Sequence, residues 1–259
     1  MKKLILLVSF CFFAASNSFA KVISEPVDYQ ENGQALQGFL YYDDAVQGVR
    51  PGVMVIHEWK GLSDYAKKRA EMLAGMGYAA FAADMYGKGV FADTHEKAAE
   101  LSGVYFKDRE RMRRRAAAAY QTFILTGKVD VSKVAAIGYC FGGTTVLEMA
   151  RSGLLLNGAA SFHGILATPS PAIKGVVRSQ VMVFNGAEDK MVLPADVESF
   201  ESEMKAADVD YQVHNFKDAM HSFTVWEANM PEKGIQYNEA ADKESWELLK
   251  AFLTKVFTV

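Results

Sequence analysis

The sequence predicts an α/β protein with a mostly parallel central sheet and helices on both faces. Short apolar runs alternate along the chain with stretches of helical periodicity, which is the order that a parallel sheet requires. Some runs, such as residues 53–56 and 181–184, are apolar at every position, as in strands buried on both faces. The chain contains no repeat, low-complexity tract or linker, so we expect one domain over residues 21–259.

The first part of the chain predicts a hairpin followed by a strand, a helix and another strand. An Asn32-Gly33 turn separates the two hairpin strands. Ser63 or Asp64 can cap the helix, whose apolar stripe ends before Gly77. The strands expected in this part cover residues 27–30, 36–42, 53–56 and 78–83.

The second part continues the alternation of helices and strands. Residues 94–125 read as helix in one or two pieces, and their Arg-rich segment 109–115 is interpreted as a solvated basic face, with an anion site as the alternative. The strand at 211–216 has mixed polarity, which is typical of a sheet edge. The other strands expected here cover residues 134–137, 158–162 and 181–184, and the other helices 144–151, 195–206 and 238–256.

Residues 1–20 are predicted to be an export signal rather than part of the fold. Lys2 and Lys3 precede an apolar run over residues 4–15, and Ser18-Phe19-Ala20 is a small-x-small cleavage site. The run is too short to span a bilayer, which needs ~20 apolar residues. We therefore expect cleavage after Ala20, no membrane association afterwards, and a periplasmic or secreted protein.

Charge and cysteine usage narrow the function further. The chain has 28 Lys and Arg against 31 Asp and Glu, and loss of the signal's two lysines makes it more acidic, which argues against nucleic-acid binding. Of the two cysteines, Cys11 lies in the signal, so an intrachain disulfide is not expected. Cys140 is then a single free thiol, which catalytic use explains better than packing.

Residues 138–143, Gly-Tyr-Cys-Phe-Gly-Gly, lie between a predicted strand and a predicted helix. This is the context of a nucleophile elbow, with Cys140 in the nucleophile position and Gly138 and Gly142 leaving room for the tight turn. The positive end of the helix dipole would stabilise a Cys140 thiolate. The alternative is that Cys140 is only a small buried hydrophobic residue.

Two further residues complete a candidate triad. Asp189 follows the strand at 181–184, and His221 lies in the loop after the strand at 211–216. The order of nucleophile, acid and histidine is that of α/β-hydrolases. Glu188 is the rival of Asp189. Of the other histidines, His95 and His214 fall in a helical surface region and inside a strand, and His57 and His163, at strand ends, suit a core or supporting role.

In this interpretation Cys140 attacks a carbonyl and forms a thioester that water then cleaves, with His221 assisting and Asp189 orienting it. The backbone N–H groups of Phe141 and Trp59 would form the oxyanion hole. The sequence lacks His-Glu-x-x-His, paired cysteines, a calcium loop and the Walker lysine. We therefore expect neither a metal nor a cofactor.

Residues 138–143, with Gly186-Ala187-Glu188-Asp189 and His221-Ser222-Phe223, resemble the dienelactone hydrolase family, the carboxymethylenebutenolidases. The resemblance extends over residues 25–257 and implies an α/β-hydrolase fold with a Cys-His-Asp triad acting on an ester or lactone. It also implies that Glu58 contacts the thiol and helps to deprotonate it; the alternative is that Glu58 only caps nearby backbone N–H groups.

The chain departs from the family where its best-known members grip a substrate carboxylate with two arginines. Lys88 stands at the first position and Val225 at the second, so Lys88 is the remaining candidate substrate-binding cation and dienelactone is an unsuitable substrate. We expect a cysteine hydrolase of small esters or lactones. The alternatives are an acyltransferase or thioesterase with the same triad, and a non-catalytic binding or stress protein.

Overall fold

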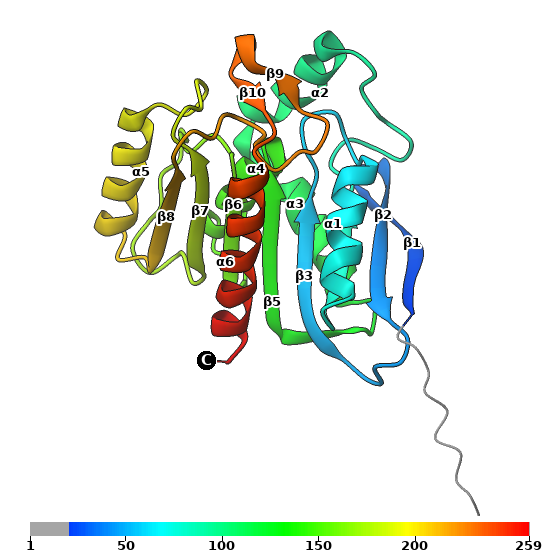
Figure 1. Cartoon of the computed structure of the whole chain (residues 1–259). Helices are drawn as coiled ribbons and strands as arrows, with labels where there is room; N and C mark the ends of the chain where they lie inside the picture. Colours follow the sequence, from blue (N-terminus) through cyan, green and yellow to red (C-terminus); the bar gives the residue numbers. More distant parts are fainter. Residues whose placement is uncertain (1–20, 259) are drawn as a thin grey trace, which may run out of the picture.

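The computed structural model describes residues 21–258, which form a three-layer α/β domain around an eight-stranded sheet (Figure 1). The strand order is β1-β2-β4-β3-β5-β6-β7-β8. The pairs β1–β2 and β2–β4 are antiparallel and the other pairs are parallel, which confirms the predicted fold class. The strands are β1 (Val22–Glu31), β2 (Gln34–Asp43), β3 (Arg50–Ile56), β4 (Ala79–Ala83), β5 (Val129–Tyr139), β6 (Gly158–Phe162), β7 (Gln180–Gly186) and β8 (Tyr211–Phe216).

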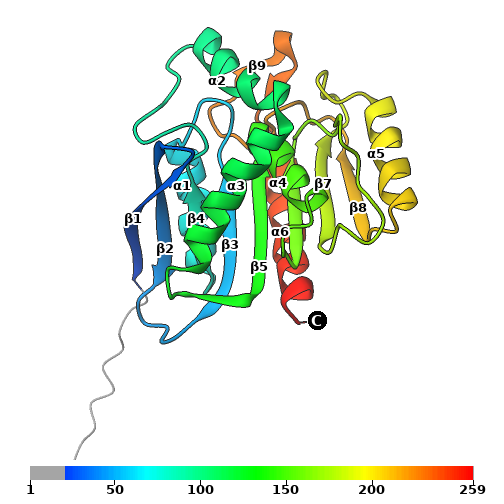
Figure 2. The ribbon, with the colours of Figure 1, turned by 180° about the vertical axis from the view of Figure 1, so that it is seen from behind.

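Helices cover both faces of the sheet. Two of them, α1 (Asp64–Ala74) and α6 (Glu239–Thr258), pack on one face (Figure 1). The opposite face carries α3 (Arg109–Ile124), α4 (Phe141–Arg151) and α5 (Pro194–Ala206) (Figure 2). The predicted helix 94–125 is in two pieces, because Asp108 ends α2 (His95–Lys107) and caps α3 through its side chain. Each face therefore has its own hydrophobic core.

The strand order places a switch point beside β5. From β3 the chain moves outward to β4, crosses back to β5, and then continues through β6, β7 and β8 in the other direction. In open α/β sheets, ligands bind beyond the carboxyl ends of the strands at such a reversal. The fold therefore indicates a site above the ends of β3 and β5.

The elbow is tighter than predicted, because α4 begins at Phe141, directly after Cys140, and not at residue 144. The helix start lies against the end of β3, where a Cβ on Gly142 would overlap the Ile56 carbonyl. A Cβ on Gly138 would overlap the carbonyl of Gly142. The two glycines therefore permit close approach of backbone to backbone, and for Gly142, inside α4, this outweighs its low helix propensity.

The interpretation of residues 109–115 as a solvated basic face is wrong for Arg109, Arg113 and Arg115, which turn toward the protein. Arg115 pairs with Glu31 of β1 at 3.0 Å, and Arg113 pairs with the fully buried Glu148 of α4 at 2.8 Å. Carboxylate partners on other elements are the reason that Arg113 and Arg115 turn away from water, while Arg109 donates to the Ala167 carbonyl.

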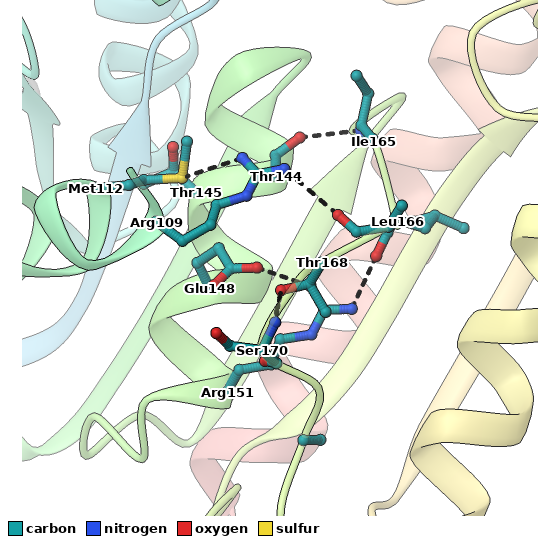
Figure 3. Close-up of polar contacts among 12 residues, drawn as sticks. Arg109, Met112, Thr144, Thr145, Glu148, Arg151, Ile165, Leu166, Thr168 and Ser170 are labelled. Atoms are coloured by element: carbon teal, nitrogen blue, oxygen red, sulfur yellow. Dashed lines mark hydrogen bonds and ion pairs between the residues drawn. The ribbon is translucent and has the colours of Figure 1, made fainter. Parts of the chain in front are cut away.

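Side chains of helix α4 also form hydrogen bonds with the loop that follows β6 (Figure 3). The Ile165 N–H donates to Thr144 Oγ1 at 2.9 Å, and Arg151 donates to the Leu166 carbonyl at 2.8 Å. Arg151 in turn pairs with Glu148 at 3.2 Å. Helix α4, which begins directly after Cys140, is thus bonded to the loop after β6 near both of its ends.

A small two-stranded sheet is absent from the sequence prediction. It comprises β9 (Asn229–Met230), a 3₁₀ turn (Pro231–Lys233) and β10 (Ile235–Gln236), and we call residues 229–236 the flap. The flap lies with α2 at the same end of the molecule (Figures 1 and 2). Strands of two residues carry no periodicity from which they could be predicted.

The predicted export signal, residues 1–20, lies outside the described residues and stays a prediction. Among residues 21–258 there is no helix that is both long and apolar enough to span a bilayer.

Candidate active site

Three side chains from separate loops meet above the sheet. Cys140 follows β5, Asp189 follows β7 and His221 follows β8. His221 Nε2 lies 3.2 Å from Cys140 Sγ, and His221 Nδ1 lies 2.8 Å from Asp189 Oδ2. The rival Glu188 is exposed, so the geometry favours Asp189 as the acid. The structure brings Cys140, His221 and Asp189 together in the arrangement that a nucleophile, a base and an orienting carboxylate require.

The electrostatics favour the protonated form of His221. Burial by itself would lower the pKa of His221, but the Cys140 thiolate and the Asp189 carboxylate outweigh it and raise the pKa to about 10. The other Asp189 oxygen accepts from the Met191 N–H at 2.7 Å, so both carboxylate oxygens are engaged. The carboxylate is thereby held in place to orient the imidazole.

Cys140 adopts backbone angles of φ 54° and ψ −112°, a conformation that costs energy for any residue other than glycine. This turn directs Sγ toward His221 while α4 starts at the next residue. As the first residue of α4, Phe141 has an N–H with no carbonyl partner inside the helix. That N–H therefore suits an oxyanion hole.

The turn after β3 is held rigidly beside the elbow. Buried His57 donates from Nδ1 to the Glu58 carbonyl at 2.5 Å and accepts at Nε2 from the Met85 N–H at 3.1 Å. Its ring stacks on Phe141 with centroids 5.8 Å apart. The Trp59 carbonyl accepts from Tyr86 OH at 2.9 Å. His57 therefore packs against Phe141 and holds the backbone at Glu58, while Tyr86 holds the backbone at Trp59.

Glu58 lies on the wall of the same cavity as Cys140. Burial raises the pKa of its carboxyl to about 7, while the His221 imidazolium acts in the opposite direction. The structure contains no hydrogen bond between the Glu58 carboxyl and the Cys140 thiol among the described residues. Glu58 is therefore on the same cavity wall as the nucleophile and has a pKa close to neutrality, and its role toward the Cys140 thiol stays a prediction.

Glu58 should leave a signature in the pH dependence of stability. The folded protein holds a proton on Glu58 between its ordinary pKa of 4.5 and about 7, whereas the unfolded chain does not, so this group lowers stability as pH rises through that window. Glu58→Gln removes the group. The Tm of the variant minus that of the wild type should therefore increase from pH 5 to pH 8, and a constant difference would contradict the raised pKa.

The triad opens into a cavity of about 620 Å³ between α2 and the flap. Apolar and aromatic side chains dominate its wall. Its charged groups are the carboxyl groups of Glu58, Asp64 and Glu227 and the ammonium groups of Lys60 and Lys68. The apolar and aromatic lining includes Trp59, Phe106, Phe141, Ile165, Val225, Trp226, Met230 and Ile235. Such a lining suits an uncharged organic ligand.

Lys88 is not brought to this cavity. Its ammonium pairs with Asp28 of β1 at 2.8 Å, and both side chains are exposed to solvent. Val225, the residue at the second of the two family positions, does line the cavity. Among residues 21–258 no cluster of three or more His, Cys, Asp or Glu is arranged to hold a metal ion.

Sequence reasoning missed two contributors to the site. The flap lines the cavity through Met230 and Ile235 and bonds to the backbone of His221. Thr224, three residues after the histidine, forms a hydrogen bond with His163. The flap sequence, residues 229–236, contains no pattern that indicates a strand or a functional site. The Thr224 contact could not be predicted because it joins residues 61 apart in the chain.

A parallel sheet with a switch point beside β5, an elbow after that strand and an acid and a histidine after later strands define an α/β-hydrolase. The dienelactone hydrolase family model matches residues 36–257, and the chain belongs to that family. It is therefore a hydrolase of the dienelactone hydrolase family.

Several known proteins are similar to this chain in sequence or in structure. A dienelactone hydrolase-like promiscuous phosphotriesterase from metagenomic libraries is 38% identical, with a TM-score of 0.85 over 92% of this chain and 100% of that one. A structure called m3DLH is 36% identical, with a TM-score of 0.86 over 91% and 99% of the two chains. An uncharacterized Caenorhabditis elegans protein is 35% identical over 133 residues, which are 50% of this chain and 84% of its own length.

Proposed function

We propose that this protein hydrolyses uncharged esters or lactones through a thioester at Cys140. The observation that carries the proposal is the 3.2 Å contact between Cys140 Sγ and His221 Nε2 inside an apolar cavity. Membership of a hydrolase family and the complete triad geometry argue against the alternative of a non-catalytic binding protein.

The reaction follows from the groups present. The Cys140 thiolate attacks the carbonyl carbon, and the oxyanion that forms accepts hydrogen bonds from the Phe141 and Trp59 N–H groups. The His221 imidazolium gives its Nε2 proton to the leaving oxygen, and the C–O bond breaks to leave a thioester. Neutral His221 then takes a proton from water, hydroxide attacks the thioester, and the Cys140 thiolate leaves. The sum is ester plus water to acid plus alcohol.

Glu58 has a proposed role before the first attack. A carboxyl group with a pKa of about 7 exchanges protons readily at neutral pH, so Glu58 can take the proton of the Cys140 thiol when the approach of a substrate brings the two groups together. Its position on the cavity wall supports this role.

The cavity favours a substrate without a negative charge. Three carboxyl groups line it against two ammonium groups, Lys60 and Lys68, and Lys68 already pairs with Glu71 at 2.8 Å. Lys88 is paired elsewhere, and Val225 occupies the position at which the family's best-known members carry an arginine. A substrate carboxylate would face like charges and an apolar wall, each of which disfavours it.

Two esters of similar length test this proposal. We expect kcat/KM for p-nitrophenyl butyrate to exceed that for mono-p-nitrophenyl succinate, which ends in a carboxylate, by at least about tenfold, the equivalent of ~1.4 kcal/mol. Val225→Arg supplies a cation in the cavity and should narrow the ratio. Equal rates for the two esters in the wild type would contradict the preference, and no turnover of either would contradict ester hydrolysis.

A second substrate class comes from the similarity to a promiscuous phosphotriesterase. A phosphotriester is also uncharged and would meet the same nucleophile and cavity. Turnover of such a triester that disappears in Cys140→Ala would support this class.

Acyl transfer remains the alternative fate of the thioester, and product analysis in the presence of an added alcohol separates it from hydrolysis.

A further inference from the structure

His163 lies directly beneath the triad and is fully buried. It follows β6 in a left-handed backbone conformation with φ of 40°. Its Nδ1 lies 3.1 Å from the backbone nitrogen of Cys140, whose N–H is shared with the Phe162 carbonyl at 2.9 Å. Its Nε2 lies 2.8 Å from Thr224 Oγ1. One imidazole therefore joins the nucleophile's backbone to a side chain in the loop of the catalytic histidine.

The backbone N–H of Cys140 fixes which nitrogen of His163 carries the proton. A backbone N–H only donates, so His163 accepts at Nδ1 and carries its proton on Nε2, which donates to Thr224 Oγ1. The same Thr224 oxygen accepts from Tyr65 OH at 2.7 Å. Tyr65 OH in turn accepts from Arg69 Nε at 3.2 Å. The chain of donors from Arg69 thus holds Thr224 as the acceptor for His163.

The charges around His163 keep it in the required neutral form. Burial, the neighbouring His221 imidazolium and the Arg69 guanidinium all lower the pKa of His163 well below its ordinary value. Its ring meets that of His221 edge-on, with centroids 5.3 Å apart. A proton on Nδ1 would point at the Cys140 N–H and break the link, so neutrality preserves the geometry.

We propose that His163 and Thr224 are positioning residues, whose hydrogen bond ties the nucleophile elbow to the His221 loop and so sets the distance between Cys140 Sγ and His221 Nε2. The two anchored points, Cys140 and Thr224, lie on loops after different strands, β5 and β8. The inference rests on the proposed roles of Cys140 and His221, but not on the identity of the substrate. Neither His163 nor Thr224 lines the cavity.

Thr224→Val tests the link, because valine matches threonine in shape but has no hydroxyl, and Thr224→Ser keeps the hydroxyl. The rate of Cys140 alkylation by iodoacetamide, followed by mass spectrometry of the Cys140 peptide, reports the Cys–His pair directly. We expect Thr224→Val to slow alkylation about tenfold and to lower kcat for p-nitrophenyl butyrate by about tenfold to a hundredfold with KM unchanged. Thr224→Ser should restore both to near the wild-type values.

His163→Asn keeps the test informative if Thr224→Val does not fold. Asparagine tolerates the left-handed backbone at this position, but it is too short to reach both Cys140 N and Thr224 Oγ1. It should also slow alkylation about tenfold. Wild-type alkylation rates in either folded variant, even with a lowered Tm, would overturn the proposal. Iodoacetamide reacts with the thiol without using an ester-binding site. If the variants slow alkylation as expected but the wild type hydrolyses no ester, only the proposed function is rejected.

Discussion

Cys140→Ala should lose at least about 10³-fold in kcat/KM toward p-nitrophenyl butyrate while remaining folded. The variant removes the only atom in the triad that can form the covalent intermediate, and the oxyanion hole and the cavity contribute what activity is left. Sγ contacts His221 at 3.2 Å and is partly accessible from the cavity, so its loss creates no buried void. Initial rates and thermal unfolding of the same preparations are the measurements.

The partners of Cys140 provide the controls for this loss. His221→Ala should be as inactive as Cys140→Ala, and the double variant should be no worse than either, because residues that act as a unit are not additive. Asp189→Asn should also lose activity, since the amide no longer holds the imidazole in the required tautomer. Glu188→Gln, at the exposed neighbouring position, should retain it. Turnover in Cys140→Ala at the wild-type rate would remove the triad as its source.

Glu148→Gln should produce the largest loss of stability among substitutions away from the active site. Glu148 is fully buried and pairs with Arg113 at 2.8 Å and with Arg151 at 3.2 Å. Removing its charge takes away the shared partner of two guanidinium groups, although Arg113 keeps Glu110 and Arg151 keeps Glu203. Loss of one partner of a buried pair costs about 3–5 kcal/mol. For a domain of this size we expect Tm to fall by roughly 10 °C.

A surface ion pair supplies the comparison for Glu148. Glu247 pairs with Lys250 on α6 at 2.5 Å, but its side chain is 68% exposed, so Glu247→Gln should change Tm little. Differential scanning calorimetry of the two variants under the same conditions measures the contrast. Similar shifts in both would mean that the buried position of Glu148 contributes nothing beyond an ordinary surface pair.

The elements and the elbow could be predicted from the sequence because their signals are local. The Asn32-Gly33 turn adopts φ of 49° and 76°, as a tight hairpin requires, and the strands around it pair in register. The sequence predicts the start of α4 three residues late, because Gly142 and Gly143 disfavour a helix and only packing against β3 and β6 explains their presence in one. Chain order then selected Asp189 and His221.

Contacts between distant segments could not be predicted in the same way. Lys88 follows the β4 strand as expected, but its direction depends on Asp28 of β1, which offers a carboxylate outside the cavity. The burial of Arg113 depends on Glu148, 35 residues later. The role of His163 depends on Thr224 in another loop. Periodicity describes one element at a time and carries no information about such partners.

The flap contributes both to the shape of the cavity and to the position of the His221 backbone. Met230 and Ile235 shape the cavity, while the Gly234 carbonyl accepts from the His221 N–H at 3.0 Å and the Gln236 N–H donates to the His221 carbonyl at 3.1 Å. An insertion or deletion there changes the catalytic backbone together with the wall. Phe106, by contrast, reaches the cavity from α2, a separate element. Substitutions on the α2 side should therefore alter substrate preference with less effect on the backbone of His221 than a change in the length of the flap.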